Sequence, residues 1–184
     1  MVRNKKIIIA IGGGGFTHSS DEDLDEFVIN QVNKSKINIG FLPTASNDNQ
    51  EKIDLFYNRF KSQKFKLSHF NLCSSVEGFN EWLLNKDIIY VGGGNTSDMI
   101  NIWKRHNLIK DFKDAYEKGI ILSGISAGAV CWFDWILSDS VNKELSPLKG
   151  VNFLDGSCTH RILQMIIDFD NLFQKLKMEI CQTE

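Results

Sequence analysis

The sequence predicts an α/β domain in which a parallel β-sheet is covered by helices on both faces. Short apolar runs rich in isoleucine and valine recur along the chain, and the segments between them carry apolar residues at helical spacing. Strands that alternate with helices pair in parallel, and both faces of such a sheet are buried. With 184 residues, 42% of them hydrophobic, the chain is long enough for one domain spanning residues 1–184.

Each element follows from its local pattern and from the residue that ends it. Leu24, Phe27 and Val28 fall on one face of the first helix, whereas Pro43 ends the second strand and Gly119 ends the last helix. The predicted strands cover residues 6–11, 37–42, 65–70, 87–91 and 120–122. The predicted helices cover about residues 24–32, 53–60, 97–104 and 108–118, and the alternation is expected to continue to about residue 135.

Four loops that follow strand ends carry distinctive sequences. They cover residues 12–17, 43–49, 92–96 and 124–129. In a parallel sheet with helices on both faces, ligands bind outside the carboxyl ends of the strands, where such loops converge. We therefore expect the functional site at this edge of the sheet.

The last of these loops has the pattern Gly-x-Ser-x-Gly, with Ser126 at its centre. A strand that turns sharply into a helix strains the central residue and exposes its hydroxyl, and the helix directs N–H groups toward it. Gly124 and Gly128 leave room for this turn. Ser126 is therefore a candidate nucleophile, although glycine, serine and alanine also occur in such turns for tight packing alone.

A serine nucleophile needs a neutral imidazole to accept its proton and an acid to orient that imidazole. His160 follows a strand-like run at residues 151–154 and a segment of small residues, which places it at a strand end within reach of Ser126. Its alternative role is that of a surface-loop histidine. No motif surrounds the other three histidines, so structural or solvated roles are expected for His18, His69 and His106.

Composition argues against several classes of partner. The formal net charge of -2 gives no electrostatic reason to expect binding to nucleic acid or to an anionic membrane. Near the N-terminus only residues 7–11 form an apolar run, which is too short for a signal peptide or a membrane span. We therefore expect a cytoplasmic protein whose partner is a small molecule.

No pattern in the sequence indicates a metal or a cofactor. The cysteines include no CxxC pair, so free thiols are expected at Cys73, Cys131, Cys158 and Cys181. Neither Cys131 nor Cys158 occupies the turn that would present a nucleophile. The glycines at residues 12–15 do not complete the GxGxxG fingerprint of a dinucleotide site.

Four motifs together resemble one known family. GISAGA at residues 124–129, GGGNT at 92–96, FLPTAS at 41–46 and GSCTH at 156–160 look like the dipeptidase E and cyanophycinase family of serine peptidases. The resemblance covers residues 5–160. It implies a three-layer, flavodoxin-like fold of the class I glutamine amidotransferase type with a mostly parallel central sheet, and a peptidase that cleaves dipeptides or short peptides.

Carried over by motif, the resemblance implies Ser126 as nucleophile and His160 as general base. Three acids are available to orient the histidine: Asp134, Asp139 and Asp155. Asp139 best matches the acidic residue that the family carries a short loop beyond the helix after the nucleophile. A solvated carboxylate at a helix end is the alternative role for Asp139.

The same resemblance implies an oxyanion hole. One donor would come from the backbone of Gly93 and Gly94, and the other would be the N–H of Ala127. Asn95 and Thr96 are candidates for substrate binding in the same loop. Either could also cap the helix that follows.

The chain departs from the family after His160. Arg161 follows directly, residues 162–184 have the pattern of one amphipathic helix, and the usual closing segment rich in glycine and aspartate is absent. Residues 161–184 are therefore atypical, which leaves a catalytically impaired binding domain of the same family as the alternative function. A glutamine-amidotransferase role is disfavoured because that chemistry uses cysteine where this chain has Ser126. The sequence is compatible with a homodimer but does not determine the oligomeric state.

Overall fold

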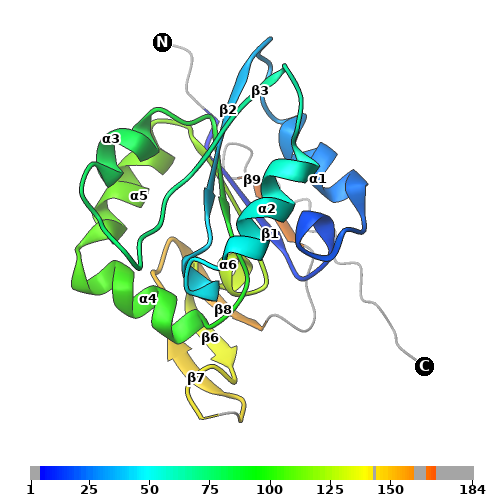
Figure 1. Ribbon diagram of the computed structural model, residues 1–184. Coiled ribbons are helices and arrows are strands. Elements are labelled where there is room, and N and C mark those ends of the chain that lie inside the picture. The colour runs from blue at the N-terminus through cyan, green and yellow to red at the C-terminus, as the bar shows by residue number, and fades with distance from the viewer. Residues whose placement is uncertain (1–4, 143, 160–164, 169–184) are drawn as a thin grey trace.

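A sheet of six strands, in the order β3-β2-β4-β5-β1-β9, runs through the middle of the molecule (Figure 1). The computed structural model describes residues 5–142, 144–159 and 165–168. The strands of this sheet are β1 (Ile7–Ile11), β2 (Ile37–Leu42), β3 (Phe65–His69), β4 (Ile88–Val91), β5 (Ile121–Ile125) and β9 (Met165–Asp168). β1 to β5 pair in parallel, and β9 pairs antiparallel with β1.

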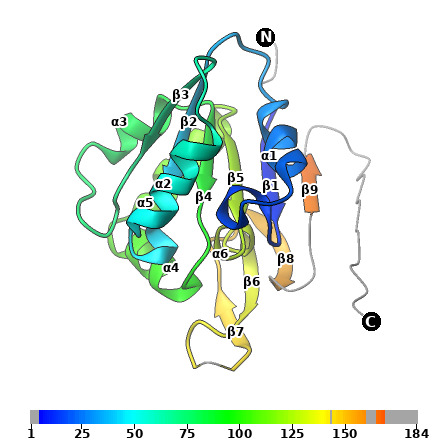
Figure 2. The same ribbon diagram turned by 45° about the vertical axis from the view of Figure 1, so that its right-hand side comes forward.

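Helices cover both faces of the sheet (Figures 1 and 2). One layer holds α1 (Glu22–Ile29) and α2 (Gln50–Arg59), and the other holds α3 (Phe79–Leu84), α4 (Thr96–Arg105) and α5 (Leu108–Glu117). Side chains alternate along each strand, so Ile7 and Ile9 join the cluster that contains Phe56, whereas Ile8 joins the cluster that contains Trp103. The predicted α/β architecture, with a parallel sheet between two helical layers, is confirmed.

Phe16 anchors the loop that follows β1. It lies in the short helix η1 (Gly15–His18) and is 2% exposed. Its ring meets Phe41 at 5.3 Å and Tyr90 at 5.4 Å between centroids, both edge to face. Burial of this one aromatic side chain holds the glycine-rich loop against the end of the sheet.

A second, smaller sheet replaces the helix expected up to about residue 135. The helix α6 (Ala127–Val130) is short, and a three-stranded sheet in the order β7-β6-β8 follows it. Its strands are β6 (Phe133–Ser138), β7 (Ser146–Lys149) and β8 (Leu154–Thr159). The helical expectation is wrong here because burial alternates from Trp135 onward: Ile136 and Ser138 are buried, while Trp135 and Leu137 are exposed. An irregularity in the strand between Phe133 and Trp135 interrupts this alternation, and Phe133 is also buried. The strand-like run also begins later than predicted, at Leu154.

The helix expected over residues 162–184 is wrong in its described part. Residues 165–168 form β9, in which Ile166 pairs with Ile9 and Ile167 pairs with Ile8. β1 would otherwise be an edge strand with unpaired backbone groups, and β-branched residues fit the pleated position beside it. Tertiary pairing therefore overrides the helical pattern. Among the residues that the structure describes, no helix is long and apolar enough to cross a membrane.

Candidate active site

Ser126 lies on a sharp turn between β5 and α6. Its backbone has φ 55° and ψ -112°, and its N–H donates a 2.9 Å hydrogen bond to the carbonyl oxygen of Ile11 in β1. The residue is partly exposed, whereas Ile125 and Ala127 on either side are buried. The turn thus holds the serine at the carboxyl end of the sheet and leaves part of it accessible.

The two glycines of the motif are required by close backbone approach. A Cβ on Gly124 would lie 2.0 Å from the carbonyl oxygen of Gly128, and a Cβ on Gly128 would lie 2.2 Å from that of Val91. No real Cβ approaches an oxygen so closely. The sequence-based reason for these glycines is confirmed, with the addition that Gly128 presses the turn against β4.

The loops predicted to converge do meet at this edge. A Cβ on Gly93 would lie 3.1 Å from Ser126 Cβ, which places the loop after β4 directly beside the serine. Gly94 has φ +150° and approaches Ala45 so closely that a Cβ would lie 2.0 Å from the Ala45 carbonyl oxygen. The Asn95 N–H donates to that same oxygen at 2.7 Å. The loop after β2 therefore supports the loop that flanks Ser126.

Three backbone N–H groups near the serine lack backbone partners. In the described part of the chain, no backbone carbonyl accepts a hydrogen bond from Gly93 or Gly94. Ala127 is the first residue of α6, so its N–H has no partner within the helix. These N–H groups are therefore available as hydrogen-bond donors, and their role as an oxyanion hole stays a prediction.

Asn95 serves as a cap and as a link between the two sheets. Its Oδ1 accepts from the Asp98 N–H at 2.9 Å, and its Nδ2 donates to the Ser140 carbonyl at 3.3 Å. Thr96 is 3% exposed. The helix-cap interpretation is confirmed for Asn95, and substrate binding by Asn95 or Thr96 stays a prediction.

Asp139 is exposed and lies in the turn that ends β6, between Ser138 and Ser140. His160 lies outside the described residues, and so does Arg161. Thr159, which precedes His160, pairs with Leu137 at the carboxyl end of the parallel strands β6 and β8.

The two other candidate acids lie at the opposite end of the small sheet. Asp134 follows Phe133 and Asp155 follows Leu154, and those two neighbours pair where β6 and β8 begin. Of the three candidates, Asp139 is therefore the one at the end of the sheet from which residue 160 continues.

The polar contacts of two residues, Ser140 and Asp25, could not be predicted from the sequence. Ser140 Oγ accepts from the Ser97 N–H at 3.2 Å, next to the Asn95 contact. Asp25, 0% exposed, lies under the loop after β1, where it contacts Arg59 Nε at 2.9 Å and Tyr90 Oη at 3.0 Å. Burial raises the pKa of Asp25, and Arg59 opposes the rise. No motif marks either residue, because these partners are distant in sequence.

The remaining histidines and cysteines have other environments. His69 Nδ1 lies 3.0 Å from Tyr57 Oη, and His106 is exposed at the end of α4; the side chain of His18 is outside the described part. Burial raises the pKa of Cys158 to about 11 and that of Cys131 well above its ordinary value. Both thiols stay protonated at neutral pH, so rejecting them as nucleophiles is supported. No group of three or more His, Cys, Asp or Glu residues within the described ranges could hold a metal ion.

A family model and one relative identify the chain. The model of Peptidase family S51 matches residues 8–180. The uncharacterized peptidase YgaJ of Bacillus subtilis (strain 168) is 40% identical over 158 residues, which is 84% of this chain and 68% of that protein. The chain belongs to Peptidase family S51. The resemblance to dipeptidase E is thereby confirmed, and the chain is a peptidase.

Solved structures share the fold of this S51 peptidase. A crystal structure of a Listeria monocytogenes EGD-e protein named for peptidase E superimposes with a TM-score of 0.67 at 17% identity, covering 91% of this chain and 96% of that one. A peptidase from an acI-B1 Actinobacterium gives a TM-score of 0.66 at 16% identity, over 82% of this chain and 66% of its own. At such low identity the likeness establishes the α/β fold alone.

Proposed function

We propose that this S51 peptidase is a serine hydrolase that cleaves dipeptides or short peptides through an acyl-enzyme on Ser126. The observation that carries the proposal is the backbone of Ser126, held at φ 55° and ψ -112° beside Gly93. A strained strand-to-helix turn of this kind is how a nucleophilic serine is exposed. The N–H groups of Gly93, Gly94 and Ala127 supply an oxyanion hole beside it.

In the proposed reaction His160 accepts the Ser126 hydroxyl proton as Oγ attacks the scissile carbonyl carbon. The C–N bond then breaks, His160 gives the proton to the leaving amine, and an ester to Ser126 remains. Water hydrolyses this ester by the same route, with His160 again taking a proton and returning it to Ser126. The negative oxygen of each tetrahedral intermediate accepts hydrogen bonds from the backbone donors.

Asp139 is proposed to orient His160. The pairing of Thr159 with Leu137 supports this role, because the segments that lead to His160 and to Asp139 leave the small sheet at the same end. The contacts of Ser140 with Asn95 and Ser97 hold that end against the loop that flanks Ser126. A carboxylate at this place stabilises the imidazolium that forms during the reaction.

Labelling with a fluorophosphonate tests the proposal, because this reagent reacts with activated serines. We expect the wild type and the control Ser35→Ala, an exposed serine away from the site, to be labelled equally. Ser126→Ala should not be labelled, and His160→Ala should be labelled slower by about a thousandfold or more. Folded wild type that resists the reagent would instead favour a binding domain of the same family.

A further inference from the structure

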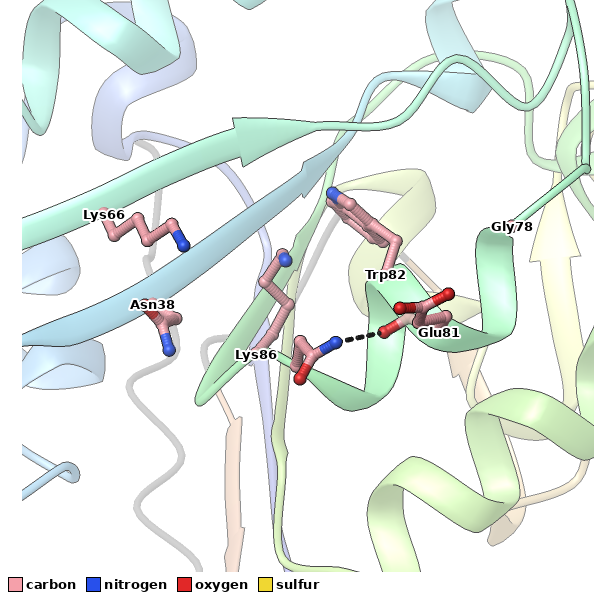
Figure 3. Close-up of a pocket in the computed structure, with 7 residues that line it drawn as sticks. Asn38, Lys66, Gly78, Glu81, Trp82 and Lys86 are labelled. Atoms are coloured by element: carbon pink, nitrogen blue, oxygen red, sulfur yellow. Dashed lines mark hydrogen bonds between the residues drawn. The ribbon is translucent and has the colours of Figure 1, made fainter.

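A cavity of about 500 Å³ lies at the amino ends of β2 and β3. Asn38 and Lys66, which are opposite each other in register, line it from the strands, and Trp82 and Lys86 line it from the α3 side (Figure 3). Its volume is in the usual range for sites that take small molecules. Ser126 follows the carboxyl end of a strand parallel to β2, so the cavity is at the opposite end of the sheet.

Two ammonium groups share this cavity. The side chain of Lys66 extends toward Lys86, whose Nζ lies 4.7 Å from the centre of the Trp82 ring (Figure 3). Burial and the charge of Lys66 lower the pKa of Lys86, against the opposing effect of Asp87. Within residues 5–142, 144–159 and 165–168, neither lysine forms an ion pair.

The nearby acids do not neutralise these lysines. The Asp87 carboxylate contacts Lys34 Nζ with one oxygen and accepts from the Asn38 N–H at 2.8 Å with the other. Glu81 is exposed and has no ion pair in the described part of the chain. Glu81 is the one acid among the residues that line the cavity, so the two lysines leave the lining with a net positive charge.

Charge rather than stacking decides what this cavity can bind. The Trp82 ring already contacts Lys86, stacks with Phe79 at 5.9 Å between centroids, and packs so closely over Gly40 that a Cβ there would lie 2.7 Å from it. It positions the ammonium of Lys86 and leaves recognition to the two lysines. A lysine is a compact point charge that suits phosphate and carboxylate oxygens.

We propose that this cavity binds a small dianion whose phosphate or carboxylate oxygens lie between Lys66 and Lys86. The attraction of such a ligand to both ammonium groups offsets their mutual repulsion, and this attraction is weaker for a singly charged ion. The proposal concerns residues at the opposite end of the sheet from Ser126, so it stands or falls independently of the peptidase mechanism.

Isothermal titration calorimetry at low ionic strength tests the site, with malonate and inorganic phosphate as dianions and acetate as the matched monoanion. We expect saturable binding of at least one dianion and much weaker binding of acetate. Lys66→Met and Lys86→Met should each weaken binding by about tenfold, because each removes one of two close charges. Lys113→Met, an exposed lysine on α5, should leave the affinity unchanged.

The two dianions distinguish a carboxylate ligand from a phosphate ligand, and binding of either through the lysines supports the proposal. Absence of saturable binding for both, equal affinity for acetate, or unchanged affinity in Lys66→Met would overturn it. Lys66 is exposed, so its replacement tests the site even if Lys86→Met disturbs the packing around Trp82.

Discussion

The backbone conformation of Ser126 differs from that of the other non-glycine helix-cap residues with positive φ. Ser19, Asp21, Asn47 and Asn107 also have positive φ, but their ψ values of 36°, 52°, 46° and 25° lie in the left-handed helical region that such residues tolerate. Ser126 has φ 55° with ψ -112°, which falls outside that region. Strain of this kind persists only where the surroundings impose it, and it concentrates at functional sites.

The pKa of the Cys73 thiol can be tested by measuring the reactivity of this one residue. Burial, followed by the charge of Asp48, raises the pKa of the exposed Cys73 to about 11. At pH 8 a smaller fraction of Cys73 is thiolate than in a free peptide, although a thiolate with a higher pKa is the stronger nucleophile. The first effect is larger, so we expect iodoacetamide to alkylate Cys73 roughly tenfold slower than a cysteine in a free peptide. Because the pKa is raised, the rate should keep climbing by about tenfold per pH unit up to pH 9.5. Mass spectrometry of the Cys73 peptide gives the rate, and a plateau below pH 9 would contradict the assignment.

At the scale of elements, β1, β2, β4 and β5 could be predicted because each is a local apolar run followed by glycine, proline or the start of a helix. The strand β3 has a weaker signal, in which Phe65 and Leu67 alternate with polar residues. The turn at Ser126 could be predicted from its local Gly-x-Ser-x-Gly pattern, in which Gly124 is required by the nearby Gly128 carbonyl. Gly128 itself is required by Val91 in β4, a contact distant in sequence that the pattern does not reveal. β9 could not be predicted, because its apolar residues fit both a helix and a strand and only the free edge of β1 decides between them. The strand β6 could not be predicted either, because the segment before it is compatible with a helix.

The pairing of β9 with β1 predicts a measurable stabilisation. A chain that stops after Gln164 keeps His160 but exposes the edge of β1, whereas a chain that stops after Asp168 keeps β9. We expect the longer chain to have a free energy of unfolding higher by about 2–4 kcal/mol, from the backbone hydrogen bonds of a four-residue strand. Urea titrations of the two truncated chains compare them directly. Equal midpoints would mean that β9 contributes nothing to stability.

At the scale of the whole molecule, the proposed site is divided between two sheets. Gly93 and Ser126 follow β4 and β5 of the central sheet, whereas Asp139 follows β6 of the small sheet and β8 leads to His160. The motifs on each part could be recognised in the sequence separately. Their juxtaposition could not be derived from the sequence, because it involves long-range contacts that no local pattern encodes. Among them are the contacts of Ser140 with Asn95 and Ser97, more than forty residues away.

Ser140 therefore offers a test of how the two sheets are held together. Ser140→Ala removes the acceptor of the Ser97 N–H, at 3.2 Å, and the partner of Ser138 Oγ, at 2.9 Å, but leaves the carbonyl that binds Asn95. Small displacements of catalytic groups are costly, so we expect fluorophosphonate labelling of Ser126 to slow by about tenfold with little change in melting temperature. Ser146→Ala is the matched control, because Ser146 Oγ contacts the Ser138 carbonyl within the small sheet, with no such bond to α4. If both variants are labelled at the wild-type rate, the link through Ser140 does not position the proposed triad. If Ser140→Ala slows labelling and also markedly lowers the melting temperature, the role of Ser140 is structural. A positioning contact would slow labelling while the melting temperature stays nearly constant.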